Sequence, residues 1–233
     1  MSSAQPAAPE EPGAPVAPEQ TAAPATPEES GAATPRRSYA KGVARRQAIL
    51  DRAIEVFARR GGHRTSLRAI AQEVGVTHAA LTHYFGSLDE LLVAVYRETE
   101  RRQDASPPRD APATPQPDPT SPAEAMRISA AENRAIPGKV ELYSTLVASA
   151  LDGAHPAAHA FVTERFTSLR ASLAERVRAL QASGALRSDV DAGLVAALVI
   201  AASDGLQTQW LLDPDVDHEA ALHLLDTLLA SQA

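Results

Sequence analysis

Apolar residues in the range 67–86 recur at the spacing of two short helices separated by a turn. The positions that make this pattern are Ile70, Ala71, Val74, Val76, Leu81 and Tyr84. Gly75 lies where the turn requires positive φ, and the Thr77 hydroxyl can accept from the first free N–H groups of the second helix. The pattern predicts a helix-turn-helix whose second helix, from His78 to about Phe85, enters a DNA major groove with its first turn.

Apolar spacing also predicts one helix before this unit and another after it. The helix before the unit is predicted at about 44–60, the first helix of the unit at 67–73, and the helix after the unit at about 88–103. Gly61-Gly62 ends the first range, and Thr65 or Ser66 caps the second. The third begins at a capping box, in which the Ser87 oxygen accepts from the N–H of Glu90 and the Glu90 side chain reaches back.

The C-terminal half shows helical spacing punctuated by Pro, Gly and Asp. It predicts five helices with the approximate ranges Ala123–Ala135, Lys139–Leu151, Pro156–Ser183, Asp191–Leu212 and His218–Ser231. The run GLVAALVIAASDGLQTQWLLD is apolar on most of its surface, and such a helix must be buried on several sides. We therefore expect an all-α fold: an N-terminal three-helix helix-turn-helix domain, then a C-terminal helical bundle whose last two helices pair with a second copy.

Two segments lack any helical pattern. Residues 1–38 are rich in Ala, Pro and Glu and contain no aromatic residue, which predicts a disordered tail. Residues 105–122 contain seven prolines, a density that excludes a helix and predicts a loop. The predicted organisation is thus a tail over 1–38, a DNA-binding domain with its connecting fourth helix over 39–104, a Pro-rich loop over 105–122, and a helical domain over 123–233.

Positive charge is concentrated on the predicted DNA-binding unit. The chain has a formal net charge of -7, yet residues 36–88 hold ten Lys and Arg against three acidic residues. This local excess is the footprint expected for phosphate binding. Arg36, Arg37, Lys41, Arg45 and Arg46 form a basic arm that leads into the first helix. It either contacts the DNA backbone or minor groove, with Arg45 as a candidate, or acts only as a solubilising flank.

Catalytic and metal chemistry find little support in the sequence. The chain has no cysteine, which excludes disulfides and Cys-based zinc sites, and it lacks the common nucleophile-elbow, phosphate-loop and zinc-protease motifs. Asp152, His155 and His159 have a spacing that could bring metal ligands together, but no fourth ligand is evident. We see no signal core and no apolar run of about eighteen residues. These features predict a cytoplasmic protein that is not an enzyme, with no cofactor, metal or membrane partner.

Residues 41–96, with TSLRAIAQEVGVTHAALTHYFGSLDELL at their centre, resemble the DNA-binding domain of the tetracycline-repressor (TetR) family of bacterial regulators. The chain has the helix, the helix-turn-helix, the aromatic-Phe-Gly-Ser end and the capped fourth helix in the family's order. The C-terminal run loosely resembles the dimerisation helices of the betaine-pathway repressor subgroup. The resemblance implies an all-helical homodimeric repressor that binds a double-stranded DNA operator. It also implies a pocket in the C-terminal part for a small-molecule effector that releases the DNA.

The resemblance assigns DNA contacts residue by residue. The implied set is Thr65 and Ser66 at phosphate, Arg68 at a base, Thr77, His78 and Ala79 at the base-reading start of the second helix, and His83 and Tyr84 near the backbone at its end. The family usually has Tyr at the position of Thr82 and Lys at that of Leu88. Thr82 can still donate one hydrogen bond, whereas Leu88 cannot. The simpler alternatives are a solvated Arg68, a His78 that reads no base and a core-facing Tyr84.

The implied effector pocket would lie among the helices from 123 to 212. Candidate lining residues are Met126, Asn133, Tyr143, Phe161, Phe166, Gln207 and Trp210. Apolar residues at helical spacing also describe an ordinary core, and Trp210 could equally anchor a dimer. The alternative function is therefore a constitutive DNA-binding dimer without effector control, whose C-terminal domain only dimerises.

Overall fold

The structure is a computed structural model that describes residues 35–60, 67–105 and 120–230, and these ranges are almost wholly helical. The helices are α1 (Pro35–Arg60), α2 (Leu67–Val74), α3 (His78–Phe85), α4 (Leu88–Ala105), α5 (Pro122–Arg134), α6 (Lys139–Leu151), α7 (Pro156–Ala182), α8 (Ala192–Leu212) and α9 (His218–Leu229). Within the described ranges no strand forms beyond an isolated bridge between Leu186 and Ala230. The predicted all-α fold class is confirmed.

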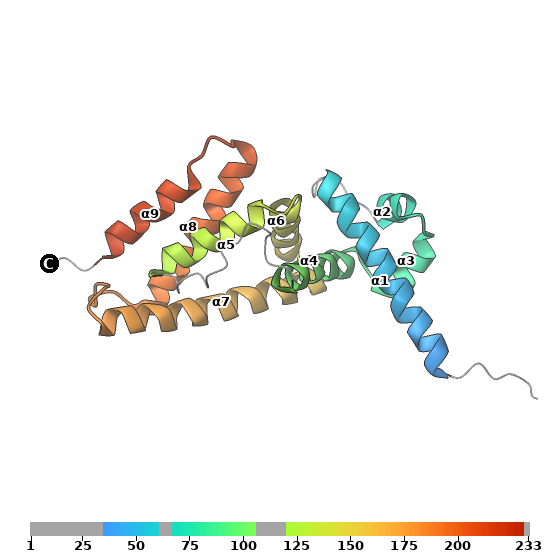
Figure 1. The fold of residues 1–233 in the computed structure, drawn as a ribbon, viewed down its shortest axis with the longest axis horizontal. Coiled ribbons are helices and arrows are strands. Elements are labelled where there is room, and N and C mark those ends of the chain that lie inside the picture. The colour runs from blue at the N-terminus through green and yellow to red at the C-terminus, as the bar shows by residue number, and fades with distance from the viewer. Residues whose placement is uncertain (1–34, 61–66, 106–119, 231–233) are drawn as a thin grey trace, which may run out of the picture.

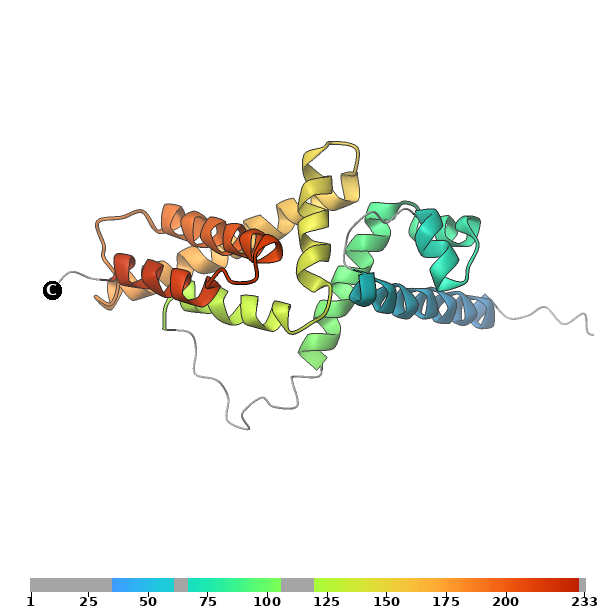
Figure 2. The ribbon, with the colours of Figure 1, turned by 90° about the horizontal axis from the view of Figure 1, so that it is seen from above.

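Helices α1–α3 gather at one end of the molecule and α5–α9 at the other, with α4 between them (Figure 1, Figure 2). The first apolar core joins α1–α4 and also takes in Leu142 and Leu146 of α6 and Phe161 of α7. The second core is built from α5, α7, α8 and α9. Because α4 packs against α6 and α7 within the first core, it joins the two ends of the molecule.

The turn between α2 and α3 has the predicted geometry. Gly75 has a φ of 75°, and the N–H of Val76 donates to the carbonyl of Ala71 at 2.9 Å. The Thr77 hydroxyl accepts from the N–H of Ala80 at 3.1 Å, which caps α3. The predictions for Gly75 and Thr77 are confirmed.

Helix α1 begins earlier than the sequence pattern indicated. It starts at Pro35, so the basic residues from Arg36 to Arg46 belong to the helix and do not form an arm ahead of it. Proline is well tolerated in a first turn, and Ala, Arg, Lys and Gln all have high helix propensity, which overrides the weak apolar periodicity of this stretch. The predicted boundary between residues 38 and 39 therefore falls inside α1. The rest of the predicted tail, Gly61-Gly62 and most of the Pro-rich loop lie outside the described residues.

The predicted capping box at the start of α4 is only half correct. The Ser87 Oγ accepts from the N–H of Glu90 at 3.2 Å, as expected. The N–H of Ser87 donates to the carbonyl of Phe85 at 2.7 Å, so the return bond from the Glu90 side chain does not form. The Ser87 hydroxyl instead donates to Asp89 at 2.5 Å, and this bond leads toward the other end of the molecule.

Helix α8 contradicts the expectation that no segment is long and apolar enough for a membrane. By length and composition alone, its 21 residues would suffice, since they include an 18-residue window with a mean hydropathy of 1.2. Val195, Val199 and Ile200 face the second core, whereas Leu194 and Leu198 are exposed. The apolar character of α8 is thus divided between a core face and an uncovered face.

Candidate nucleic-acid interface and ligand cavity

The first turn of α3 lies on the surface, and the rest of the helix packs into the first core. Thr77, His78 and Ala79 are exposed, whereas Leu81 and Phe85 are buried in the first core. This arrangement follows from the apolar spacing, because the residues on the core side hold the helix while the capped first turn projects outward. A projecting, capped first turn is the geometry that a major groove can accept.

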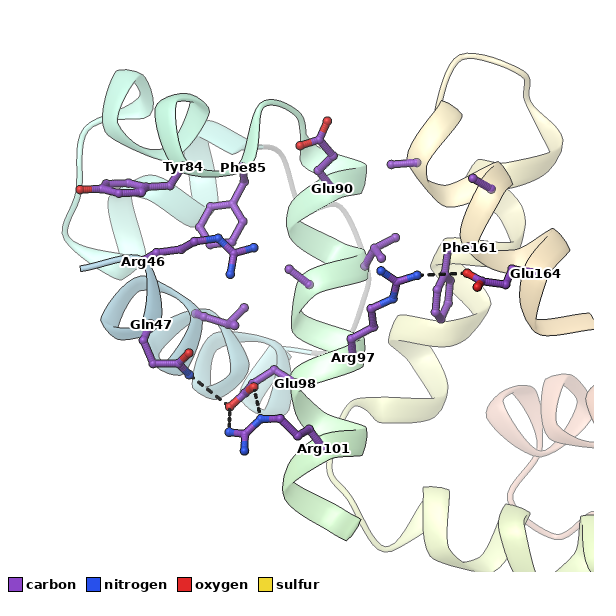
Figure 3. A pocket seen from close by; sticks show the side chains of 15 residues that line it. Arg46, Gln47, Tyr84, Phe85, Glu90, Arg97, Glu98, Arg101, Phe161 and Glu164 are labelled. Atoms are coloured by element: carbon purple, nitrogen blue, oxygen red, sulfur yellow. Dashed lines mark hydrogen bonds and ion pairs between the residues drawn. The ribbon is translucent and has the colours of Figure 1, made fainter. Parts of the chain in front are cut away.

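The other predicted DNA contacts divide into three groups. Arg45 on α1, Arg68 on α2, and Thr82 and His83 on α3 are exposed. Tyr84 is half-buried against the first core, and Figure 3 shows its hydroxyl pointing away from the neighbouring groove. Thr65 and Ser66 lie outside the described residues.

The two positions that depart from the TetR pattern, Thr82 and Leu88, both interact within their own end of the molecule. The Thr82 hydroxyl donates to the carbonyl of His78 at 3.0 Å, so its proton is used inside α3. Leu88 is half-buried and packs on the first core, where a lysine could not serve the same purpose. Exposed basic residues on α1, Lys41 and Arg45 among them, offer positive charge elsewhere on this end of the molecule.

A groove of about 550 Å³ separates the helix-turn-helix end from α7 and is shown in Figure 3. On one wall the Arg46 guanidinium lies 4.7 Å from the centre of the Phe85 ring. Across the groove, Arg97 of α4 pairs with Glu164 of α7 at 3.2 Å. The paired charges leave the groove with no strong preference for a charged ligand.

Glu98 joins α1 and α4 at the edge of this groove. Its carboxylate accepts from Arg101 at 2.6 Å, from Arg102 at 2.9 Å and from the Gln47 amide of α1 at 3.1 Å. The hydrogen bond from Arg101 and the charges of both arginines lower the pKa of Glu98 to about 2, against the opposing effect of burial. Glu98 is therefore ionised throughout the neutral pH range, and its hydrogen bond with Gln47 holds α4 against α1.

Asp89 connects the first turn of α4 to the first turn of α7. Its carboxylate is only 3 % exposed and accepts from the N–H groups of Ala157 at 2.9 Å and Ala158 at 3.4 Å. The residue at the N-cap position of α7, His155, makes no side-chain capping bond. Asp89 of α4 therefore caps α7 in place of His155. Its carboxylate lies at the N-termini of both α4 and α7, where the two helix dipoles favour a negative charge.

A second, more enclosed cavity of about 200 Å³ lies among α4, α5, α6, α7 and α8. Four of the seven residues predicted for the effector pocket line it: Met126, Asn133, Tyr143 and Gln207. The other three lie elsewhere. Phe161 packs edge-on against the Tyr96 ring at 5.4 Å, Phe166 packs between the two cores, and the half-buried Trp210 lies 5.8 Å from the Arg134 guanidinium.

The cavity also contains charged residues and a tyrosine that the sequence analysis did not identify: Tyr96, Lys139, Arg165, Arg176 and Asp204. Arg165 donates to Glu100 at 2.8 Å, and its guanidinium lies 5.3 Å from the ring centres of both Tyr96 and Tyr143. A signal was present at Asp204, the one charged residue inside the apolar run of α8. An acidic residue there needs a polar partner within the bundle.

Burial shifts the ionisation of these groups. It lowers the pKa of Lys139, to which the nearby Arg165 also contributes, and it raises the pKa of Asp204 above its usual value. Burial likewise raises the pKa values of Tyr96 and Tyr143, so both hydroxyls stay protonated at neutral pH. Tyr143 can therefore donate to Asp204, whose oxygen lies 3.4 Å away.

The spacing of Asp152, His155 and His159 does not produce a metal site in the described part of the chain. His155 lies between two carboxylates, with its Nε2 3.4 Å from Asp152 and its Nδ1 3.9 Å from Asp89. His159 is exposed one turn further along α7. The imidazole of His155 thus belongs to the junction between α4 and α7.

Comparisons with known proteins agree with this division into two ends. Residues 49–95 match the family described as bacterial regulatory proteins, tetR family, and residues 137–233 match the C-terminal domain of BetI-type transcriptional repressors. The HTH-type transcriptional regulator BetI of Rhizobium meliloti is 38 % identical over 73 residues, which is 30 % of this chain and 36 % of that protein. The matched region thus spans about a third of the length of this curated relative.

Solved structures share the fold over most of the chain. A tetR-family protein from Streptomyces coelicolor is 29 % identical, with a TM-score of 0.54 over 79 % of this chain and 98 % of that one. A transcriptional regulator from Saccharomonospora viridis in complex with choline is 19 % identical, with a TM-score of 0.59 over 82 % of this chain and 100 % of that one. At that identity the second likeness concerns the fold alone.

Proposed function

Because this chain belongs to the tetR family of bacterial regulatory proteins and has a BetI-type C-terminal domain, we propose that it is a homodimeric repressor released from its operator by a small-molecule effector. The matched relatives are transcriptional regulators, which confirms the prediction that the chain is not an enzyme. The observation that carries the proposal is the projecting, capped first turn of α3 on the basic end of the molecule.

DNA binding is assigned to this first turn and to the basic side chains around it. His78 and Ala79 would meet base edges, while Arg68 on α2 and Arg45 on α1 provide exposed guanidinium groups. Because residues 36–88 carry a net positive charge and the rest of the chain is acidic, an operator would be attracted to one end only. A cytoplasmic location follows from this role.

Dimerisation is assigned to the uncovered faces of α8 and α9, which lie side by side in Figure 1. Four leucines are exposed there: Leu194 (73 %), Leu198 (54 %), Leu224 (58 %) and Leu228 (60 %). Each pair is spaced by four residues, so each forms an apolar stripe along its helix. A two-fold axis would bury both stripes against the same stripes of a second copy and would present two α3 helices to successive major grooves.

Effector control is assigned to the enclosed cavity because α4 forms part of its wall. Tyr96 of α4 lines the cavity and packs on Tyr143 of α6 at 5.7 Å and on Phe161 of α7. A molecule that repositions Tyr96 would shift α4 and, through it, the helix-turn-helix. That the fold can hold a small molecule is seen in the choline complex of the Saccharomonospora viridis protein. The effector must bind the DNA-incompetent state more tightly, and typical couplings are about 1–3 kcal/mol.

Selection of bound duplexes from a random pool, followed by gel shifts, tests the proposal. We expect a palindromic site whose half-sites are about one helical turn apart, bound by a dimer in light scattering. A protein that stays monomeric, or one that enriches no sequence, would contradict it.

Replacing Arg68 with alanine should weaken binding to the selected site by about 5- to 150-fold, because a guanidinium that reads a base discriminates by about 1–3 kcal/mol. Binding to unrelated DNA should change little. Fluorescence anisotropy on both duplexes measures the two effects. Arg178→Ala, which removes an exposed guanidinium from α7 at the other end, is the matched control. Equal losses on both duplexes would show that Arg68 contacts only phosphate.

A further inference from the structure

The cavity proposed for the effector holds more positive than negative charge. Lys139, Arg165 and Arg176 line it, against the single carboxylate of Asp204. Glu100 lies beside the cavity and accepts from Arg165, so the charge of Arg165 has a carboxylate partner. The carboxylate of Asp204 is turned toward the Tyr143 hydroxyl. By formal charge the lining is therefore positive.

Lys139 is the clearest part of this excess. It is only 4 % exposed, and its ammonium donates to the neutral amide oxygen of Gln103 at 2.6 Å. Within the described residues no carboxylate forms an ion pair with it. Glu100, Glu132 and Asp104 attract the ammonium through their charge alone. A buried ammonium with no carboxylate in direct contact is costly, and a folded chain normally avoids it. The chain contains only one other lysine, Lys41, and uses arginine at its remaining basic positions.

The aromatic rings of the cavity are already occupied by the protein's own cations. The Lys139 ammonium lies 5.6 Å from the centre of the Tyr96 ring, and the Arg165 guanidinium lies 5.3 Å from the ring centres of both Tyr96 and Tyr143. A cationic ligand would need free aromatic ring faces to bind by cation–π interactions. Here it would meet two positive groups instead, so the cavity disfavours amines and quaternary ammonium compounds.

The remaining lining suits a small and partly apolar molecule. Met126, Val140 and Leu169 provide apolar surface, while Ser129 and Asn133 provide hydrogen-bonding groups. The volume of about 200 Å³ lies below the range of roughly 300–1,000 Å³ that is usual for drug-sized ligands. A compact molecule with one charged end and a short apolar body would fill it.

We propose that the effector is a small organic monocarboxylate whose carboxylate pairs with Lys139, beside Arg165, and whose apolar part packs on Met126 and Leu169. The inference rests on the proposed effector role of this cavity. Lys139 is the first residue of α6 and Arg165 lies on α7, so a bound carboxylate would draw both helices toward Tyr96 of α4. The ligand thereby supplies Lys139 with a carboxylate in direct contact.

The presence of only two lysines allows a direct test with benzoate as the probe. In the full chain labelled with ¹³C-lysine, the two side-chain signals come from Lys41 and Lys139, and Lys139→Met assigns them. We expect benzoate to move the Lys139 signal and leave the Lys41 signal in place, and to raise Tm. Benzylammonium, similar in size and opposite in charge, should do neither. In Lys139→Met, benzoate should bind about 10- to 100-fold more weakly, as expected for loss of a charged hydrogen bond.

Arg178→Met, which removes an exposed charge of the same sign from α7, should bind benzoate as the unmodified chain does. The inference would be overturned if neither benzoate nor hexanoate moved the Lys139 signal, or if benzylammonium acted as strongly. It would also fail if inorganic phosphate bound more tightly than either carboxylate. Gel shifts separate the two proposals: benzoate that binds at Lys139 without weakening operator binding contradicts effector control, whereas operator binding without carboxylate binding contradicts only the ligand class.

Discussion

Glutamate in place of both Leu198 and Leu228 is expected to convert the protein to a monomer and to lower its operator affinity by at least about 100-fold. Burial of one leucine side chain contributes about 1.5–3 kcal/mol, and a two-fold interface uses each position twice. The variant would lose this contribution and would also have to bury four carboxylates without partners. Light scattering measures the assembly state, and gel shifts on the selected duplex measure the affinity.

Two comparisons make this result specific to the surface formed by α8 and α9. Leu151, at the end of α6, is 83 % exposed, and Leu151→Glu should leave both the dimer and operator binding intact. Circular dichroism should show an unchanged helix content for the double variant, because Leu198 and Leu228 are not part of either core. A double variant that stays dimeric would place the interface elsewhere.

Helices, turns and caps that are determined by residues close together in the chain could be predicted from the sequence. The ranges of α3 and α6 agree with the predicted helices, and the turn at Gly75 and the cap at Thr77 formed as expected. Each depends on residues within one helical turn, where periodicity and capping chemistry are informative. The early start of α1 was missed because it depends on summed helix propensity, which carries no apolar pattern.

Features that join distant segments could not be predicted in this way. Lys139 and Arg165 reach the same cavity from separate helices, and nothing in their local sequence says that they face each other. Phe161 was predicted at the cavity because it lies on the correct helix, yet its ring packs on Tyr96 toward the groove. Helical spacing identifies the buried face of a helix. It does not say whether a residue on that face lines the groove or the enclosed cavity.

Asp89 is the most consequential of these long-range contacts, and its replacement should weaken the junction between the two ends of the molecule. In Asp89→Asn the N–H groups of Ala157 and Ala158 lose a charged acceptor, and α7 loses the cap that His155 does not provide. Such bonds contribute about 1.5–3 kcal/mol, so we expect Tm to fall by about 3–12 °C. Urea unfolding measures the change in free energy, and Asp215→Asn, an exposed carboxylate between α8 and α9, is the matched control.

The pH dependence of this loss distinguishes a charged cap from simple packing. Burial raises the pKa of Asp89, but the Ser87 hydroxyl and the N–H groups of Ala157 and Ala158 together hold it below the usual 3.8. A carboxyl with a lowered pKa stabilises the fold above its unfolded value and loses that contribution as the pH falls through the folded value. The difference in unfolding free energy between the unmodified chain and Asp89→Asn should therefore be full at neutral pH and shrink below about pH 4. His155→Ala in both proteins removes the imidazole that lies 3.9 Å from Asp89. A difference that stayed constant down to pH 3 in that background would mean that Asp89 acts through its shape and not its charge.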